Sequence, residues 1–461
     1  MRLSPKYLFA LSAFALAACD NDNIGGAPLG AGADPIETTT LQLLHASPDA
    51  PAVNVYVDGT LRAGNVDYKT ASAISNVTVG SHSVRVDAIL PGGAEATVFG
   101  PADVDFAADS ITTIAAVGPV AIPLDVAVAV KGDSGPADGN ARLFVLHATA
   151  GPAGPLPVDV YVDAYSEPNA PIGTSMPFSF DFKGTLGPVE VPAGDYQIRV
   201  TLAGDPNPVY DSGLVSLGDG DDLTLAAVPN VSGGPAAVTL LAIDGGGAGE
   251  ILDASTPTAL RVGHLSPDTD PVDIVVNGGV FLANVPYPAI TGLTPLDPAT
   301  YSVSITDAGN PGAIAFGPAD LDLAAGTWYS VFATDFNANL TVDILTDDPR
   351  PVALYAKVRI YHASPTAQNV DIYLTDPALL GDITDVDPVL TDVPFGANTG
   401  YLALDGGDYD VAVTPTGTKD IAISASLPTL ENGGVYTAIA RDPVPGSTEF
   451  GLEVLVDTLA D

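Results

Sequence analysis

Apolar and polar residues alternate with a period of two along many short stretches of this chain. In the stretch 370–375 (VDIYLT), Val370, Ile372 and Leu374 stand at every second position, and the stretch 408–413 (DYDVAV) alternates in the same way. A period of two is typical of a β-strand with one buried face. Gly, Pro, Asp and Asn separate these stretches, and beyond residue 40 no long stretch keeps a helical period. The pattern therefore predicts an all-β chain of short antiparallel strands packed as β-sandwiches.

A strand-like run that ends in histidine occurs four times. The four residues are His45, His147, His264 and His362. Their spacing is too long for a solenoid repeat or a propeller blade, and it is long enough for each unit to bury its own core. We therefore expect four tandem β-sandwich domains. Their expected bounds are 41–135, 141–246, 257–346 and 355–461.

A later run in three of the four units places a tyrosine two residues after a small residue. These residues are Tyr196, Tyr301 and Tyr409, and His82 takes the corresponding place in the first unit. Immunoglobulin-like sandwiches use such a tyrosine corner to tie the ring hydroxyl back to the backbone at the start of a strand. The pattern favours immunoglobulin-like domains in which these residues and the four histidines are structural positions.

The run that follows each histidine carries a family resemblance. HASPDAPAVNVYVDG from His45 resembles the opening signature of the Domain of Unknown Function 4397 family, and so do the stretches from His264 and His362. The second copy departs most, because HATAGPAGPLPVDVYVDA from His147 has three extra residues and no Ser-Pro. The resemblance implies a bacterial exported or surface protein built of β-sandwich modules. It implies no activity and no binding residues.

The first residues read as an export signal. Residues 1–18 carry two basic residues near their start, Arg2 and Lys6, and continue into an apolar run that is too short to span a membrane permanently. Leu16-Ala17-Ala18-Cys19 resembles the lipobox of bacterial lipoproteins, in which the cysteine is acylated by fatty acids such as palmitate and becomes the new N-terminus. The alternative is an ordinary secretory signal that is cut near Ala18, with Cys19 incidental. Residues 19–40 are small, polar and rich in glycine, which predicts a flexible tether with a reach of about 25 Å.

The four histidines also raise the question of catalysis. Each has a hydroxyl two residues on, and an acid or amide follows further along, as with Asp273 after His264. A Ser-His-Asp site could be drawn from such residues. However, a hydrolase needs one site rather than four drifting copies, and the first copy has the uncharged Asn54 in place of the acid. The histidines also share strand parity with core residues. We expect a structural role, with metal or ligand contact as an alternative, and no catalytic residues.

Composition narrows the partners and cofactors. Acidic residues outnumber basic ones 56 to 15 for a net charge of −41, which excludes nucleic-acid binding. The single cysteine excludes disulfides within the chain. The acidic turns that start at Asp219, Asp335 and Asp385 lack the later glycine and glutamate of an EF-hand loop. We expect no cofactor, and weak Ca²⁺ binding is left open.

Together these features predict a non-enzymatic protein that is lipid-anchored through Cys19 and faces the periplasm or the cell surface. Tandem modules suit binding or adhesion to an envelope or extracellular polymer or protein, because weak sites add avidity. They suit a structural spacer equally. The alternatives are a periplasmic enzyme and a calcium-dependent polymer-binding protein.

Overall fold

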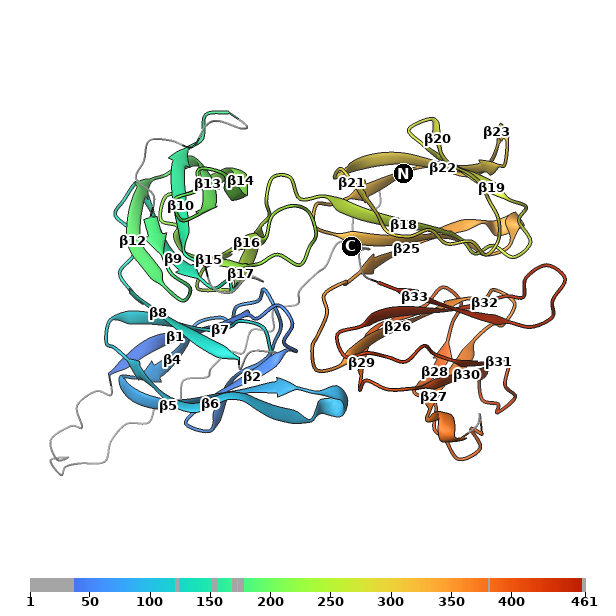
Figure 1. Cartoon of the computed structure of the whole chain (residues 1–461), viewed down its shortest axis with the longest axis horizontal. Coiled ribbons are helices and arrows are strands. Elements are labelled where there is room, and N and C mark those ends of the chain that lie inside the picture. Colours follow the sequence, from blue (N-terminus) through green and yellow to red (C-terminus); the bar gives the residue numbers. More distant parts are fainter. Residues whose placement is uncertain are drawn as a thin grey trace, which may run out of the picture. The chain divides into compact units, whose positions relative to one another are not determined.

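The computed structural model describes residues 37–120, 124–150, 156–167, 172, 178–379 and 382–457. Within these ranges the regular elements are β-strands and short 3-10 turns, so the all-β prediction is confirmed (Figure 1). No helix in this part of the chain is long and apolar enough to cross a membrane. The expected signal peptide 1–18, the lipidation residue Cys19 and most of the expected tether lie outside the described residues.

The strands fall into four sets, which we call repeats 1 to 4. Repeat 1 contains β1 (Thr38–Ala46), β2 (Val53–Val57), β3 (Thr60–Val66), β4 (Ser75–Thr78), β5 (Gly80–Ile89), η1 (Pro91–Gly93), β6 (Glu95–Phe106), β7 (Ser110–Val117) and β8 (Asp125–Gly132). Repeat 2 contains β9 (Asn140–His147), β10 (Val158–Ala164), β11 (Phe178–Phe180), β12 (Thr185–Pro192), β13 (Gly194–Leu202), β14 (Pro208–Leu217), β15 (Asp222–Pro229), β16 (Val238–Ile243) and β17 (Ala248–Ile251).

The last two sets follow the same plan. Repeat 3 contains β18 (Thr258–His264), β19 (Val272–Val276), β20 (Gly279–Val285), β21 (Thr294–Leu296), β22 (Ala299–Asp307), β23 (Asn310–Leu323), β24 (Trp328–Thr334), η2 (Asn337–Asn339) and β25 (Thr341–Asp347). Repeat 4 contains β26 (Ala356–Ala363), β27 (Val370–Thr375), η3 (Pro377–Leu379), β28 (Leu390–Val393), β29 (Asn398–Leu404), β30 (Asp410–Pro415), β31 (Ile423–Ser426), β32 (Val435–Arg441) and β33 (Gly451–Val456).

Each repeat is a sandwich of two sheets. One sheet contains the strand that carries the repeat histidine near its end, and we call it the His sheet. The four His sheets have the orders β4-β1-β7-β8, β12-β9-β15-β16-β17, β21-β18-β24-β25 and β29-β26-β32-β33. The second sheets have the orders β3-β2-β5-β6, β11-β10-β13-β14, β20-β19-β22-β23 and β28-β27-β30-β31. Figure 1 shows the two layers of repeat 4 in orange and red.

Pairing within the sheets is mainly antiparallel, as predicted, but each His sheet contains one parallel pair. These pairs are β1/β7, β9/β15, β18/β24 and β26/β32. In each case the chain passes through the second sheet before it returns beside the first strand. A connection of that length can bring two strands side by side in the same direction, which a tight hairpin cannot.

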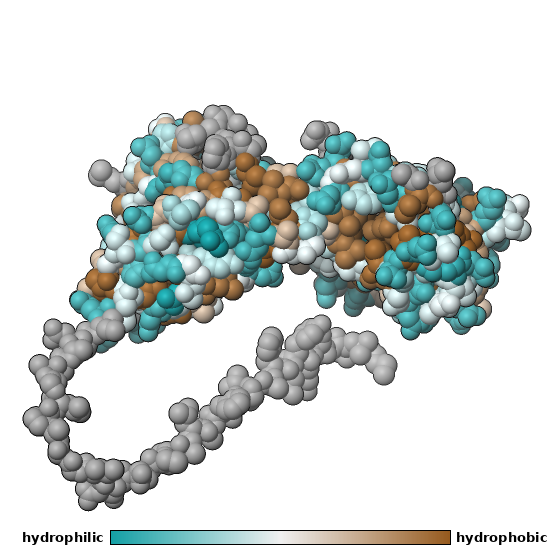
Figure 2. All heavy atoms as spheres, turned by 90° about the horizontal axis from the view of Figure 1, so that it is seen from below, coloured by the Kyte–Doolittle hydropathy of each residue, from teal (hydrophilic) through white to brown (hydrophobic). Residues whose placement is uncertain are grey.

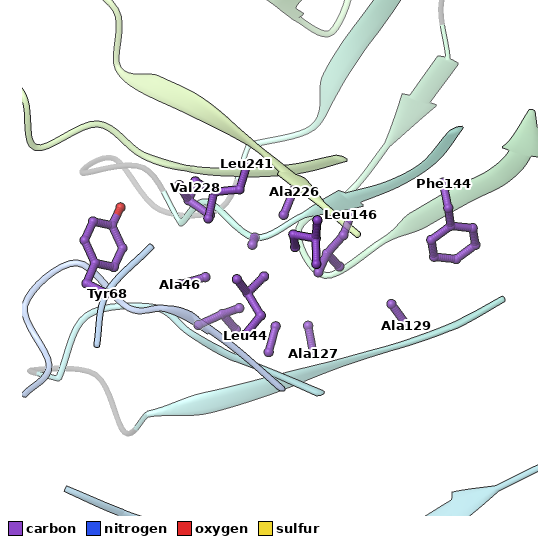
Figure 3. Packing of buried hydrophobic residues seen from close by; sticks show 14 residues of the cluster. Leu44, Ala46, Tyr68, Ala127, Ala129, Phe144, Leu146, Ala226, Val228 and Leu241 are labelled. Carbon is purple, nitrogen blue, oxygen red and sulfur yellow. The ribbon is translucent and has the colours of Figure 1, made fainter. Parts of the chain in front are cut away.

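The His strands are buried on both faces, although a period of two predicts one buried face. In β1, Leu41 and Leu43 pack inside the sandwich of repeat 1 against residues such as Phe106. The alternate residues Leu44 and Ala46 belong to a different cluster. That cluster also contains apolar residues of repeat 2, and Figure 3 shows the two groups of side chains facing each other. The second face is therefore buried by a neighbouring repeat.

Repeats 3 and 4 share a smaller cluster of the same kind. Leu265, Phe332 and Leu345 of repeat 3 pack with Tyr361 and Ile439 of repeat 4. The outer surface, by contrast, mixes polar and apolar residues on the face shown in Figure 2. The apolar residues of the His strands thus serve two cores, one inside each repeat and one between repeats.

Candidate functional site

Each repeat histidine ties the end of its strand to the loop that leads to the second sheet. All four rings are nearly or completely buried. In each, Nε2 lies within hydrogen-bond distance of a backbone carbonyl in that loop. The pairs are His45 with Pro51 O at 2.9 Å, His147 with Leu156 O at 3.0 Å, His264 with Asp270 O at 3.4 Å and His362 with Gln368 O at 2.6 Å.

The carbonyl partners determine the tautomer. Because a carbonyl only accepts, Nε2 must carry the hydrogen, and Nδ1 is then an acceptor in the neutral ring. In three repeats the backbone N–H two residues on lies 3.3 to 3.4 Å from Nδ1, as for Ser266 and His264. Burial lowers the pKa of all four histidines, and that of His45 falls to about 4. The rings are therefore neutral at pH 7.

The hydroxyl two residues after each histidine does not bond to the ring. Ser47 Oγ donates to Gly118 O at 2.5 Å, and Thr149 Oγ1 donates to Ala227 O at 2.9 Å. Ser266 pairs with a neighbouring threonine, and Ser364 donates to Asp442. Three of these hydroxyls bond the loop to another chain segment, and that of Ser266 bonds within the loop. None bonds to the imidazole, so none is placed to be activated by it.

The acid or amide that follows each histidine in the sequence does not bond to the histidine ring but to other groups. Asp273 accepts the N–H of Asn284 at 2.7 Å and that of Gly309 at 2.9 Å. The equivalent residues likewise accept backbone N–H groups from strands or turns of the second sheet, and they are Asn54, Asp159 and Asp371. The structure therefore does not bring the serine, histidine and aspartate of any repeat together as a triad.

The tyrosines of the later run hold a strand start to its own chain. Each hydroxyl donates to the carbonyl four residues earlier, the geometry of a tyrosine corner. The bonds are Tyr196 to Pro192 O at 2.7 Å, Tyr301 to Asp297 O at 2.7 Å and Tyr409 to Asp405 O at 3.0 Å. In repeat 1, His82 Nε2 lies 2.8 Å from Thr78 O, again four residues earlier.

His82 differs from the tyrosines because it can carry a charge. Its Nδ1 lies 2.6 Å from a carboxylate oxygen of Asp58. The hydrogen bond to Asp58 raises the pKa of His82, and burial partly opposes this rise. Repeat 1 thus closes its corner with an ion pair when the imidazole is protonated.

The acidic turns use their carboxylates within the fold. Asp219 accepts the N–H of Gly139 at 2.7 Å, Asp221 that of Gly218 at 2.6 Å, and Asp335 that of Phe336 at 2.7 Å. Among the described residues there is no group of three or more His, Cys, Asp or Glu side chains that could hold a metal ion.

Comparison with known proteins identifies the family to which the chain belongs. The sequence model described as "Domain of unknown function (DUF4397)" matches residues 39–156, 258–373 and 356–461, well over half of the chain. The chain belongs to the DUF4397 family. The matched segments include the strands of repeats 1, 3 and 4 and the start of repeat 2.

Other comparisons add little to the family match. No curated protein matches the chain. The Bacillus anthracis TIE protein is 12% identical, with a TM-score of 0.16 over 88% of this chain and 69% of that one. A streptococcal ancillary pilin is 11% identical (TM-score 0.12, 66% and 100%). The fimbrial anchor protein Mfa2 from Porphyromonas gingivalis is 9% identical (TM-score 0.13, 69% and 97%). At these TM-scores the likeness carries no functional meaning.

Between DUF4397 repeats 3 and 4 lies a set of buried charges that the sequence analysis missed. Arg261, Asp347, Arg359 and Asp457 have side chains that are 0 to 3% exposed. We call these four residues the charge quartet. Burial raises the pKa of Asp347, and the neighbouring Arg359 and Arg261 oppose this rise. The available signal was an arginine three residues before the histidine in LRVGH and VRIYH, on the strand face opposite the sandwich core.

A second link between repeats comes from the aromatic residue that packs edge-on against each histidine. In repeats 2 and 4 it is phenylalanine. In repeats 1 and 3 it is Tyr68 and Tyr287, whose hydroxyls donate to the next repeat, at Pro229 O and Asp442 O respectively. In every repeat the histidine therefore holds the loop that follows it. In repeats 1 and 3 the tyrosine beside the histidine also holds the next repeat.

Proposed function

We propose that this DUF4397 chain is a lipid-anchored bacterial envelope protein whose repeats form a structural spacer facing the periplasm or the cell surface. The observation that carries the proposal is the double burial of the His strands. Residues such as Leu44 and Leu146 belong to a core that two repeats share. Repeats that share a core resist relative motion, whereas modules joined only by linkers move freely. A spacer needs this resistance.

The N-terminal sequence supports the anchoring part of the proposal. Cys19 follows an apolar leader and stands in a lipobox-like sequence. Acyl chains attached there would hold the chain to the membrane, since each buried methylene contributes about 0.8 kcal/mol. Residues 20–37 would then separate the membrane from repeat 1, because β1 already begins at Thr38, inside the expected tether.

Adhesion is the second candidate, and one surface favours it. On the second sheet of repeat 1, Tyr56 is partly exposed, with the Arg85 guanidinium 4.4 Å from the ring centre and Glu95 within hydrogen-bond distance of its hydroxyl. In repeat 4 the corresponding Tyr373 is covered by Ile383 of its own loop. An accessible aromatic ring beside hydrogen-bonding groups is a surface that could contact a polymer or protein.

Anchoring is tested by labelling cells with an alkyne analogue of palmitate. The unchanged chain should incorporate the label and sediment with membranes, whereas a Cys19→Ser variant should do neither. Unlabelled wild-type chain in the soluble fraction would contradict the proposal. Protease treatment of intact cells then distinguishes the two faces. Digestion of repeats 1 to 4 indicates the cell surface, and protection until the outer barrier is broken indicates the periplasm.

A further inference from the structure

We propose that the outward face of each His sheet is a pairing surface that selects its partner repeat, and that repeats 3 and 4 select each other through the charge quartet. The partner that fits the face of repeat 3 is the face of repeat 4 in the same chain. This inference goes beyond the proposed function, because it holds whether or not the chain is an envelope spacer.

The shortest ion pairs of the charge quartet join repeat 3 to repeat 4, rather than two residues of the same repeat. Arg261 Nη2 lies 2.6 Å from Asp457 of repeat 4 but 3.5 Å from Asp347 of its own repeat. Arg359 Nη2 lies 2.5 Å from Asp347 of repeat 3 but 3.9 Å from Asp457 of its own repeat. Each guanidinium thus makes its shortest ion pair with the other repeat, and the set is complete only when both faces meet.

Two hydroxyl groups and a backbone carbonyl provide further hydrogen bonds to the charge quartet. Ser330 donates to Asp347 at 2.7 Å, and Tyr401 donates to Asp457 at 2.8 Å. Arg359 also donates from Nη1 to Thr346 O at 3.0 Å. Buried charges are costly unless every member is paired and hydrogen-bonded. A face that met the wrong partner would keep the cost of burial without the compensating bonds.

The other two repeats lack the matching charges. Three residues before the histidine, repeats 1 and 2 have Gln42 and Phe144 where repeats 3 and 4 have arginine. Lys131 of repeat 1 takes the place of Asp347, because it stands opposite the equivalent position of its neighbouring strand. Repeat 1 presented to repeat 4 would set Lys131 against Arg359. Two like charges at a buried contact repel each other, which makes the pairing of repeat 1 with repeat 4 unfavourable.

Side-chain size makes the pairing of repeats 3 and 4 directional. Phe332 and Tyr361 stack with ring centres 5.5 Å apart at an angle of 19°. In repeat 3 the position equivalent to Tyr361 is Gly263, where an added Cβ would lie 2.7 Å from the Phe332 ring. Repeat 3 thus offers a glycine and a flat ring, and repeat 4 supplies the tyrosine that covers them. Two copies of either face would not match in this way.

The sharpest test compares two double variants of the full chain that remove the same number of charges. Arg359→Met with Asp347→Leu keeps the 2.6 Å pair between repeats, Arg261 and Asp457. Arg359→Met with Asp457→Leu keeps only the 3.5 Å pair within repeat 3. We expect the first variant to show the higher melting midpoint for repeats 3 and 4 and slower hydrogen exchange in β18 and β26. An equal or reversed order would overturn the proposal.

Partner selection is tested by giving repeat 3 the charge of repeat 1. Asp347→Lys should lower the melting midpoint of repeats 3 and 4 by about 10 °C, because an uncompensated buried charge remains. It should also expose β18 and β26 to exchange while leaving β1 and β9 protected. Asp125→Lys is the matched control, since Asp125 pairs with Lys183 across repeats 1 and 2 but is 50% exposed. Equal, small effects of the two changes would refute selection by the quartet.

Discussion

At the scale of single residues, a buried neutral imidazole makes folding sensitive to acid. His45 is fully buried, and its pKa is lowered from 6.5 to about 4. Below pH 6.5 the His45 ring of the unfolded chain binds a proton, whereas the ring of the folded chain stays neutral until the pH approaches 4. The stability contributed by the neutral ring is complete above pH 6.5 and is lost as the pH falls from 6.5 toward 4.

This effect is measurable with a variant that keeps the hydrogen bond but does not titrate. In His45→Gln the amide can still donate to Pro51 O. We expect the free energy of unfolding of the wild type to fall by about 3 kcal/mol more than that of the variant between pH 7 and pH 4. Urea denaturation at a series of pH values provides the comparison. Parallel pH profiles for the two proteins would contradict this assignment of the ring.

His82 should behave in the opposite direction. Its pKa is raised by Asp58, so the corner contact is stabilised fully below pH 6.5 and weakens as the pH rises through the folded pKa. His82→Tyr gives repeat 1 the residue found in the other three repeats and should remove this pH dependence. Chemical-shift titration of the His82 ring reports its pKa directly. A value at or below that of an ordinary histidine would exclude the ion pair.

Residues with local partners were the ones that the sequence could reveal. Tyr196, Tyr301 and Tyr409 each bond to a carbonyl four residues back, so both partners of the contact lie within one short run of the sequence. The partner of His362 is likewise six residues away. The Arg261 and Asp457 pair spans 196 residues, and no local pattern can predict such a contact.

At the scale of strands, the period of two correctly predicts one buried face for strands that face solvent on the other side. It does not describe the burial of strands that lie between two repeats. In β2 the burial alternates through Val53, Val55 and Val57 as a half-buried strand should. In β9 every residue from Ala141 to His147 is buried. The run of apolar residues in β9 was visible in the sequence. Its second partner was not, because a period describes faces and does not say what covers them.

The contribution of the core shared by repeats 1 and 2 to the free energy of unfolding can be measured by shortening one leucine. Leu146 is completely buried in that cluster, whereas Leu214 of the same repeat is 54% exposed. Leu146→Ala should lower the free energy of unfolding by about 2 to 5 kcal/mol, the usual cost of a cavity in a packed core. Leu214→Ala should change it by less than about 0.5 kcal/mol. Urea denaturation of both variants makes the comparison, and similar losses would mean that the joint is not packed as a core.

At the scale of the whole molecule, contacts also connect the two pairs of repeats. Trp328 of repeat 3 donates to Ser232 O of repeat 2 at 3.1 Å. Arg350, in the segment between repeats 3 and 4, donates to Ala50 O of repeat 1 at 2.9 Å and to Asp67 at 2.7 Å. The four repeats are therefore coupled beyond the two shared cores, in a chain that the sequence alone presented as separable domains.

This coupling predicts how the molecule unfolds. Arg350 is almost buried and supplies hydrogen bonds to a carbonyl and a carboxylate of repeat 1. The bond to the buried Ala50 carbonyl contributes about 1.5 to 3 kcal/mol, because the donor is charged. The ion pair with Asp67 contributes less, since the Asp67 side chain is 55% exposed and solvent screens the pair. Arg350→Ala removes both and leaves Ala50 O without this donor. We expect calorimetry to show repeats 1 and 2 unfolding apart from repeats 3 and 4 in the variant, where the wild type shows closer overlap of the two events. Arg62→Ala, at an exposed position of repeat 1, serves as the control and should leave the profile unchanged. If Arg350→Ala also leaves it unchanged, the pairs unfold independently, and the rigidity proposed for the spacer would extend only within each pair.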